Sequence, residues 1–213
     1  MTRQGIFLAD GPSDLPLSRH LEEICSGLGT DVALTAVDPR LLGDVGRTVA
    51  GRLRFLRDEG FPFDLVFVHR DAEGQEPDLR RMEVASGAAA AGVTSPVVPV
   101  VPIRMTEAWL LLDEAAIRRV ASKPLGTVPL GLPTPAEAER LSDPKEFLAE
   151  VLLRASGTTG RRRQQFVRDF GRHRARLLEL LDVTGPVKGL VAWQQLYADT
   201  AAALAALDDV GRS

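Results

Sequence analysis

The sequence predicts an α/β fold in which a roughly four-stranded, mostly parallel sheet is flanked by helices. Short apolar runs that are typical of strands alternate with amphipathic helical patterns over the first half of the chain. This β-α order favours parallel strands, because each parallel crossover needs a helix. With 213 residues and 45% hydrophobic content, the chain is long enough for one sizeable core with a small helical annex.

Four strands are expected. They cover Gly5–Ala9, Asp31–Val37, Phe63–His69 and Pro96–Ile103. The third is the clearest, since an apolar run rich in Val and Phe is typical of a buried strand. Prolines 96, 99 and 102 cannot donate to a ladder, so the fourth strand is expected at an edge of the sheet or with irregular pairing.

Helical patterns separate and follow these strands. They cover Leu15–Leu28, Gly43–Glu59, Pro77–Ala91, Thr106–Val120, Pro144–Ala155, Arg161–Leu181 and Leu190–Leu207. Asp143 as N-cap and Glu146 as its capping-box partner open the helix at Pro144. Residues 122–142 are rich in Pro and Gly and predict a structured connector. We therefore expect an α/β core over 1–121, this connector, and a helical, arginine-rich region over 143–213 packed on the core.

Composition narrows the functional class. No apolar segment approaches the roughly 20 residues of a membrane span, and no signal sequence is evident, so we expect a cytoplasmic protein with no membrane partner. The single cysteine, Cys25, excludes an intrachain disulfide and a Cys-based zinc site. A net charge of -3 argues against a protein that coats nucleic acid indiscriminately.

Acidic residues follow three of the predicted strands: Asp10 after the first, Asp71 and Glu73 after the third, and Glu107 after the fourth. The carboxyl ends of parallel strands lie at one edge of the sheet, where ligands bind in open α/β folds. Carboxylates suit Mg²⁺ or Mn²⁺, which keep waters for substrate phosphates. The pattern predicts a metal site for phosphodiester chemistry, although acids after a strand are often only polar loop residues.

Three of the neighbouring side chains have competing interpretations. Glu107 shares a helical face with Leu110 and Leu111, so it needs a partner such as the metal or Arg104, unless it only stabilises the helix N-terminus. Asp14 is better explained as a helix cap. His69 is still within the strand pattern and is expected to be a satisfied core histidine.

The region from Arg154 to Arg176 contains eight arginines and one acid, Asp169. Guanidinium groups bind phosphates, so we expect nucleic-acid contact there; the alternative is a solvated face or a face that docks onto an acidic partner protein. Phe166 and Phe170 are four residues apart and are expected on the core face of the helix, which leaves base readout unsupported. The predicted nucleic-acid-binding residues are Arg161, Arg162, Arg163, Arg168, Arg172 and Arg174.

Four motifs together carry a family resemblance. They are the acid-Gly turn after the first strand, the Asp-x-acid pair at 71–73, Glu-Ala-Trp-Leu-Leu-x-Asp at 107–113, and Asp-Pro-Lys at 143–145. From about Ile6 to Leu207 the chain resembles bacterial TOPRIM-like proteins of unknown function, which are related to overcoming-lysogenisation-defect (OLD) family nuclease domains and to anti-phage effectors. The Glu-Ala-Trp motif is the most specific part of this resemblance.

The resemblance implies roles for individual residues. Asp10 takes the place of the TOPRIM glutamate that acts as general acid or base, with Asp14 a less favoured substitute, and Asp71 and Glu73 match the Mg²⁺-binding pair. Asp10 is one methylene shorter than glutamate, and Glu73 replaces an aspartate. Lys145 lies in a shared motif, where it contacts a phosphate or is a solvated first-turn lysine.

The sequence leads to two functional hypotheses. The first is a metal-dependent nuclease that cleaves DNA or RNA, in the manner of an anti-phage effector, with Asp10 and Lys145 catalytic and with Asp10, Asp71, Glu73 and Glu107 holding Mg²⁺ or Mn²⁺. The second is a non-catalytic subunit that docks onto an ATPase or sensor protein. The oligomeric state is left open.

Overall fold

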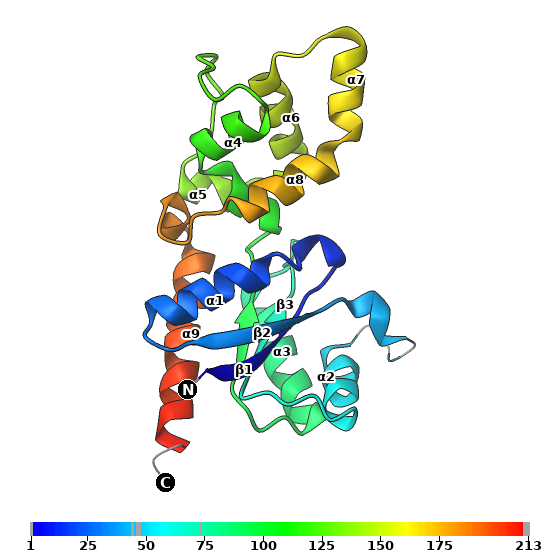
Figure 1. Cartoon of the computed structure of the whole chain (residues 1–213), viewed down its shortest axis with the longest axis vertical. Helices are drawn as coiled ribbons and strands as arrows, with labels where there is room; N and C mark the ends of the chain where they lie inside the picture. Colours follow the sequence, from blue (N-terminus) through cyan, green and yellow to red (C-terminus); the bar gives the residue numbers. More distant parts are fainter. Residues whose placement is uncertain (1, 44, 46–47, 73, 211–213) are drawn as a thin grey trace.

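A four-stranded parallel sheet forms the centre of the computed structural model, in the order β2-β1-β3-β4, which confirms the predicted fold class (Figure 1). The structure describes residues 2–43, 45, 48–72 and 74–210. The strands are β1 (Arg3–Leu8), β2 (Val32–Val37), β3 (Leu65–His69) and β4 (Val97–Val100). The chain passes from β1 to β2 on one side and then to β3 on the other, so the strand order reverses between β1 and β3.

The fourth strand lies at an edge of the sheet, as its prolines predict. It ends at Val100 rather than at Ile103, because Pro102 has no amide hydrogen to continue the ladder. The backbone beyond it still lies along the continuation of β3: Val100 O accepts from Arg70 N at 3.1 Å, and Pro102 O accepts from Ala72 N at 3.3 Å. These bonds fix the backbone on either side of Asp71, just after the end of β3.

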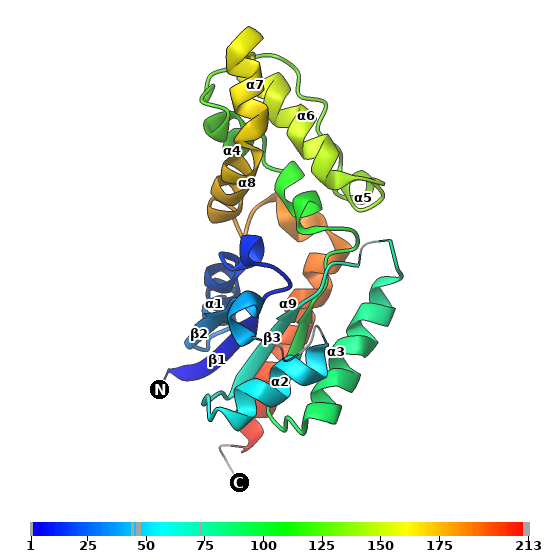
Figure 2. The same cartoon turned by 90° about the vertical axis from the view of Figure 1, so that its right-hand side faces the viewer.

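Two helices cover each face of the sheet (Figures 1 and 2). The pairs are α1 (Leu17–Gly27) with α9 (Val191–Val210), and α2 (Val49–Asp58) with α3 (Pro77–Ala91). Successive residues of a strand point to opposite faces, so Phe7 packs in the core of α1 and α9 while Ile6 and Leu8 pack in the core of α2 and α3. The sheet is therefore a middle layer with a separate hydrophobic core on each side.

The remaining helices form a lobe at the carboxyl end of the sheet (Figure 1). They are α4 (Glu114–Val120), α5 (Pro135–Ala138), α6 (Pro144–Ser156), α7 (Gly160–Arg168) and α8 (Phe170–Glu179). Their buried apolar residues continue the core of α1 and α9 without interruption. At the junction, Trp109 and Trp193 pack edge to face, with ring centroids 5.0 Å apart. This places α9 with the sheet, although the sequence assigns it to the annex.

Two predicted helices are each divided in the structure. The segment from Thr106 forms a 3₁₀ helix, η3 (Thr106–Leu111), and α4 starts afresh because the Asp113 side chain accepts from Ala116 N at 2.9 Å. The arginine-rich segment bends at Asp169, which ends α7 and precedes α8. Asp143 caps α6 as predicted, but the reciprocal capping box occurs instead at Thr134 and Glu137.

The helices that the structure describes include none with the length and apolar character needed to span a membrane.

Close contact between α2 and α3 depends on Gly87, and its loss is expected to destabilise the fold. A Cβ atom at this position would lie 2.8 Å from Val49 Cβ. Alanine normally favours a helix over glycine by ~1 kcal/mol, but overpacking costs roughly 1–3 kcal/mol. We expect Gly87→Ala to lower the free energy of unfolding in urea by about 1 kcal/mol or more.

Gly27→Ala in α1 is the matched control, because nothing lies within 4 Å of a Cβ built there. This variant should be neutral or slightly stabilising. Equal stabilisation by both substitutions would contradict the packing argument.

Candidate functional site

The candidate site lies where the strand order reverses, beyond the carboxyl ends of β1 and β3. Asp10 lies two residues after β1, and Asp71 lies two residues after β3. Open α/β sheets bind ligands in this position because the connections from the two strands leave in opposite directions. The Asp10 and Asp71 side chains are 27% and 20% exposed, so both carboxylates are accessible to a ligand.

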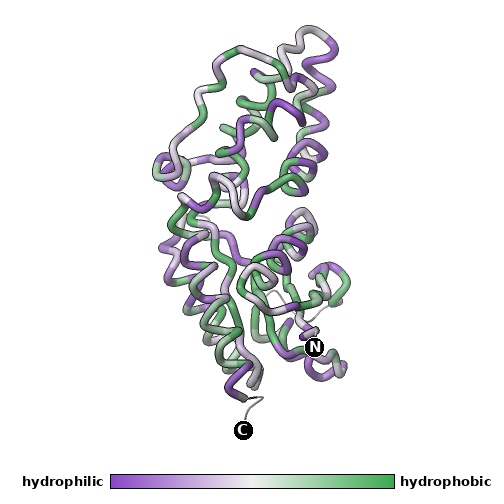
Figure 3. The backbone as a smooth tube through the Cα atoms, turned by 60° about the vertical axis from the view of Figure 1, so that its left-hand side comes forward, coloured by the Kyte–Doolittle hydropathy of each residue, from purple (hydrophilic) through white to green (hydrophobic). Residues whose placement is uncertain are grey.

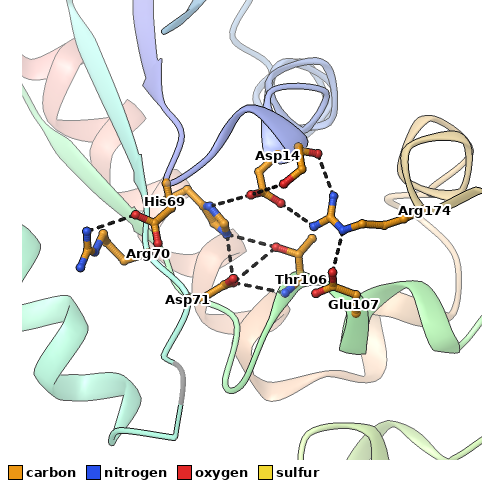
Figure 4. Close-up of polar contacts among 9 residues, drawn as sticks. Asp14, His69, Arg70, Asp71, Thr106, Glu107 and Arg174 are labelled. Atoms are coloured by element: carbon orange, nitrogen blue, oxygen red, sulfur yellow. Dashed lines mark hydrogen bonds and ion pairs between the residues drawn. The ribbon is translucent and has the colours of Figure 1, made fainter. Parts of the chain in front are cut away.

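Asp71 is held through one of its two oxygens (Figure 4). Its Oδ1 accepts from the backbone N of Thr106 at 3.2 Å and lies 3.4 Å from both Thr106 Oγ1 and His69 Nε2. Its Oδ2 has no hydrogen-bond partner among the described residues. The contacts on Oδ1 therefore orient the carboxylate and leave the other oxygen available.

His69 is fully buried at the end of β3, which agrees with its expected place in the core. Its Nε2 lies 3.1 Å from Thr106 Oγ1, and its Nδ1 lies 3.9 Å from Asp14 Oδ2. Burial lowers the imidazole pKa, but Asp71 raises it by hydrogen bonding and by charge, and Asp14 and Asp10 add to this, so the net pKa is above its ordinary value. The ring therefore lies between Asp14 and Asp71.

Asp10 is paired with Arg70. The guanidinium Nη1 lies 3.1 Å from Asp10 Oδ1, and Nη2 lies 3.3 Å from Glu83 Oε1 on α3. As with Asp71, the second oxygen of Asp10 has no partner among the described residues. Arg70 therefore compensates the charge of Asp10 and links the end of β1 to α3.

Arg174 binds the other two acids of this region (Figure 4). Its Nη2 donates to Asp14 Oδ1 at 2.6 Å, its Nε donates to Glu107 Oε1 at 2.7 Å, and its Nη1 donates to the carbonyl of Ser13 at 2.7 Å. All three ionic side chains are buried, and the two carboxylates raise the Arg174 pKa against the effect of burial. This group ties α8 to η3 and to the 3₁₀ helix η1 (Pro12–Asp14).

This arrangement changes the expected roles of three residues. Arg174, expected on a nucleic-acid-binding surface, lies in the interior with only 6% of its surface exposed. Glu107, expected to bind metal or Arg104, is paired with Arg174 instead. Asp14 does not cap α1, whose N-cap is Pro16, so the cap interpretation is wrong. The spacing of Arg174 from the buried Leu177 and Leu178 was a sequence signal for its inward position.

The other predicted residues are more dispersed. Glu73 lies outside the described residues. Lys145 lies in the first turn of α6, where it lines a pocket with Phe166 and Phe170; Asp10 and Asp71 are not part of that pocket. The remaining arginines of the predicted nucleic-acid-binding set are exposed on α7 and α8; they are Arg161, Arg162, Arg163, Arg168 and Arg172. Figure 3 colours much of α7 as hydrophilic.

The described residues provide part of the ligand set of a divalent cation. No group of three or more His, Cys, Asp or Glu side chains in the described part of the chain is placed to hold a metal ion. Mg²⁺, however, is often held by one or two carboxylates together with water and substrate phosphates. The free Oδ2 atoms of Asp10 and Asp71 match that kind of site, whereas Asp14 and Glu107 are neutralised by Arg174.

Comparison of the chain with models of protein families, with curated proteins and with solved structures found no match.

Removal of the buried Arg174 charge is expected to destabilise the protein strongly. Arg174→Met leaves Asp14 and Glu107 buried without a counter-charge, which costs about 3–5 kcal/mol. The exposed Arg172→Met, two residues away, should change stability by less than about 0.5 kcal/mol. Urea unfolding of both variants tests the difference.

A triple variant separates charge from shape. Adding Asp14→Asn and Glu107→Gln to Arg174→Met removes the unpaired charges, so most of the lost stability should return. If Arg174→Met alone unfolds like Arg172→Met, the ion pairs do not hold α8 to the sheet.

A second link between α8 and the sheet layer predicts a pH effect. His20 on α1 lies with Nε2 2.6 Å from the carbonyl of Leu178, and burial lowers its pKa below the ordinary value of 6.5. The unfolded chain therefore takes up a proton at a higher pH than the folded chain does, and stability falls as the pH drops through 6.5. His20→Gln keeps an amide donor but cannot titrate.

The free energy of unfolding of wild type should thus decrease more than that of His20→Gln when the pH is lowered from neutral to mildly acidic. Chemical denaturation across this range provides the measurement. Parallel curves for the two proteins would show that His20 is not buried in its neutral form.

Proposed function

We propose that this protein is a divalent-metal-dependent phosphodiesterase that acts on nucleic acid, with its reaction centre at Asp10 and Asp71. The observation that carries the proposal is the position of these two accessible carboxylates at the point of strand reversal. The TOPRIM-like motifs add Glu73, two residues after Asp71 in the sequence, as a further oxygen ligand. Mg²⁺ or Mn²⁺ bound there would activate a water and neutralise charge on the phosphodiester.

The protein's own groups have separate tasks in this proposal. Asp71 is a ligand whose orientation is set by Thr106 and His69 through Oδ1, so that Oδ2 serves the cation. Asp10 contributes its Oδ2, while its Oδ1 is paired with Arg70. Because Arg70 also contacts Glu83, it can remain attached to α3 if its contact with Asp10 lengthens when a cation binds.

The exposed arginines of α7 and α8 support nucleic acid as the substrate class. The guanidinium groups of three of them, Arg161, Arg162 and Arg163, make no hydrogen bond or ion pair with other described residues. Exposed guanidinium groups that lack acidic partners are suited to phosphate contacts, which supply most of the affinity of sequence-independent binding. The substrate would thus be held by the helical lobe and cleaved at the sheet edge.

A second candidate function rests on the ion pairs. Arg70 occupies an oxygen of Asp10, and Arg174 removes Asp14 and Glu107 from the set of available ligands. The same fold without metal chemistry would serve as a subunit that docks onto an ATPase or sensor protein through its arginines. Absence of Mg²⁺ and Mn²⁺ binding in calorimetry, together with copurification of an acidic partner, would favour this candidate.

Substitution of Asp71 tests the catalytic proposal. Asp71→Asn keeps the shape and the contact with Thr106 but removes the charge, so Mn²⁺ affinity should fall and cleavage should slow by about 100-fold or more. Mn²⁺ titration calorimetry and cleavage of single-stranded DNA, duplex DNA and RNA are the measurements.

Asp31→Asn is the matched control, since this exposed carboxylate precedes β2 at the opposite end of the sheet. It should bind Mn²⁺ and cleave nucleic acid as wild type does. Cleavage that survives Asp71→Asn unchanged would place the reaction elsewhere.

A further inference from the structure

An open apolar pocket separates the first turn of α6 from the junction of α7 and α8. Its volume is about 380 Å³, near the lower end of small-ligand pockets. Ala149, Phe166, Val167 and Phe170 contribute its mostly apolar lining. Val167 is 54% exposed, although valine side chains are usually buried. The two phenylalanines pack against the hydrophobic core as partly buried residues, as expected, and they also line this cavity, which opens to solvent.

The aromatic wall of the pocket is preorganised. Phe166 stacks on His173 with ring centroids 4.1 Å apart and planes 23° from parallel. Burial lowers the His173 pKa, so the imidazole is neutral near pH 7 and the stack carries no charge of its own. A ring fixed in this way offers a flat surface with little loss of side-chain entropy on binding.

Charged groups line one side of the pocket. Lys145 and Glu146 lie at its α6 side, together with Asp143, and the exposed arginines of α7 belong to the same helix as Phe166. Phosphates are favoured by the arginines and by Lys145 but are disfavoured directly beside the two acids. The exocyclic amino groups of bases, in contrast, can donate to those carboxylates.

We infer that this pocket binds an unpaired base of a nucleic-acid strand, with the flanking phosphates on Lys145 and on Arg161, Arg162 and Arg163. The inference rests on the proposed function and narrows its substrate class to single-stranded or locally unpaired nucleic acid. It also explains why Lys145 lies beside Phe166 rather than beside Asp71: its phosphate is one next to the bound base, away from the bond that is cleaved.

Charge and shape favour this occupant over an acidic peptide. Single-strand binding combines a basic surface with aromatic side chains on which bases stack, and both occur here on one helix. A peptide anchor would need only an apolar pocket, for which leucine serves as well as phenylalanine. The requirement for an aromatic face is thus the property that separates the two occupants.

Fluorescence anisotropy with labelled strands of about 20 nucleotides tests the inference on the full-length protein, in EDTA so that cleavage cannot interfere. Wild type should bind the single strand more tightly than its duplex and more tightly than an abasic strand of equal charge. Phe166→Leu should weaken single-strand binding about tenfold, the range expected for one lost base stack, and should leave abasic binding unchanged. Phe166→Tyr should bind within about twofold of wild type.

A combined Arg161→Gln, Arg162→Gln, Arg163→Gln variant separates the phosphate contribution. It should weaken binding of the intact and the abasic strand alike and reduce the salt dependence of both. Thermal unfolding of each variant shows whether a loss of binding reflects a loss of fold, and Phe166→Tyr keeps the test valid if Phe166→Leu is unstable.

Three results would overturn the inference: equal binding of intact and abasic strands, unchanged binding by Phe166→Leu, or tight binding of a labelled Glu- and Leu-rich peptide that Phe166→Leu preserves. Failure of the proposed function gives a different result. In that case base-dependent binding is present, but no cleavage depends on Asp71.

Discussion

The buried guanidinium of Arg174 is the contact on which the rest of the structure depends. One side chain from α8 neutralises carboxylates that follow two different parts of the sheet, Asp14 and Glu107, and also binds a backbone carbonyl. Without it, two ionised groups would be buried at a cost of several kcal/mol each. The pairing has a chemical consequence as well, because it divides four neighbouring acids into two that are structural and two that remain open to a ligand. The helical lobe thereby determines which carboxylates at the sheet edge stay accessible to a ligand.

The molecule combines an acidic sheet edge, held by ion pairs, with a basic surface that is barely packed. No residue of α7 is buried, whereas α8, directly after it, contributes Arg174, Leu177 and Leu178 to the interior. The bend at Asp169 permits this change of environment within one arginine-rich segment. It turns the first half of the segment toward solvent and the second half toward the sheet. Electrostatics explains the same division. Arginines without acidic neighbours are stabilised by hydration, whereas the desolvation cost of burying Arg174 is offset by its attraction to two carboxylates.

Much of the fold was predictable because it depends on local patterns. Apolar runs, proline positions and the N-cap at Asp143 predicted the alternation of strands and helices in the first half, the edge position of β4 and the start of α6. The division of the acids was not predictable, because it depends on a contact between Asp14 and Arg174 that are 160 positions apart. Composition showed an arginine cluster but not which member turns inward, although Leu177 and Leu178 offered a clue. The open pocket at Phe166 was missed for a related reason: spacing of four residues identifies a face of a helix, but not what covers that face.

The position of α9 has a consequence for how the chain folds during synthesis. This helix covers the same face of the sheet as α1, and the side chain of Arg3 in β1 reaches the carbonyl of Leu207. The apolar side of β1 and β3 therefore stays without its second helix until residues 191–210 have left the ribosome. A nascent chain that pauses earlier exposes this face and must avoid association with other chains in the interval. Trp193 belongs to the same helix, so its packing on Trp109 also waits until α9 has been synthesised.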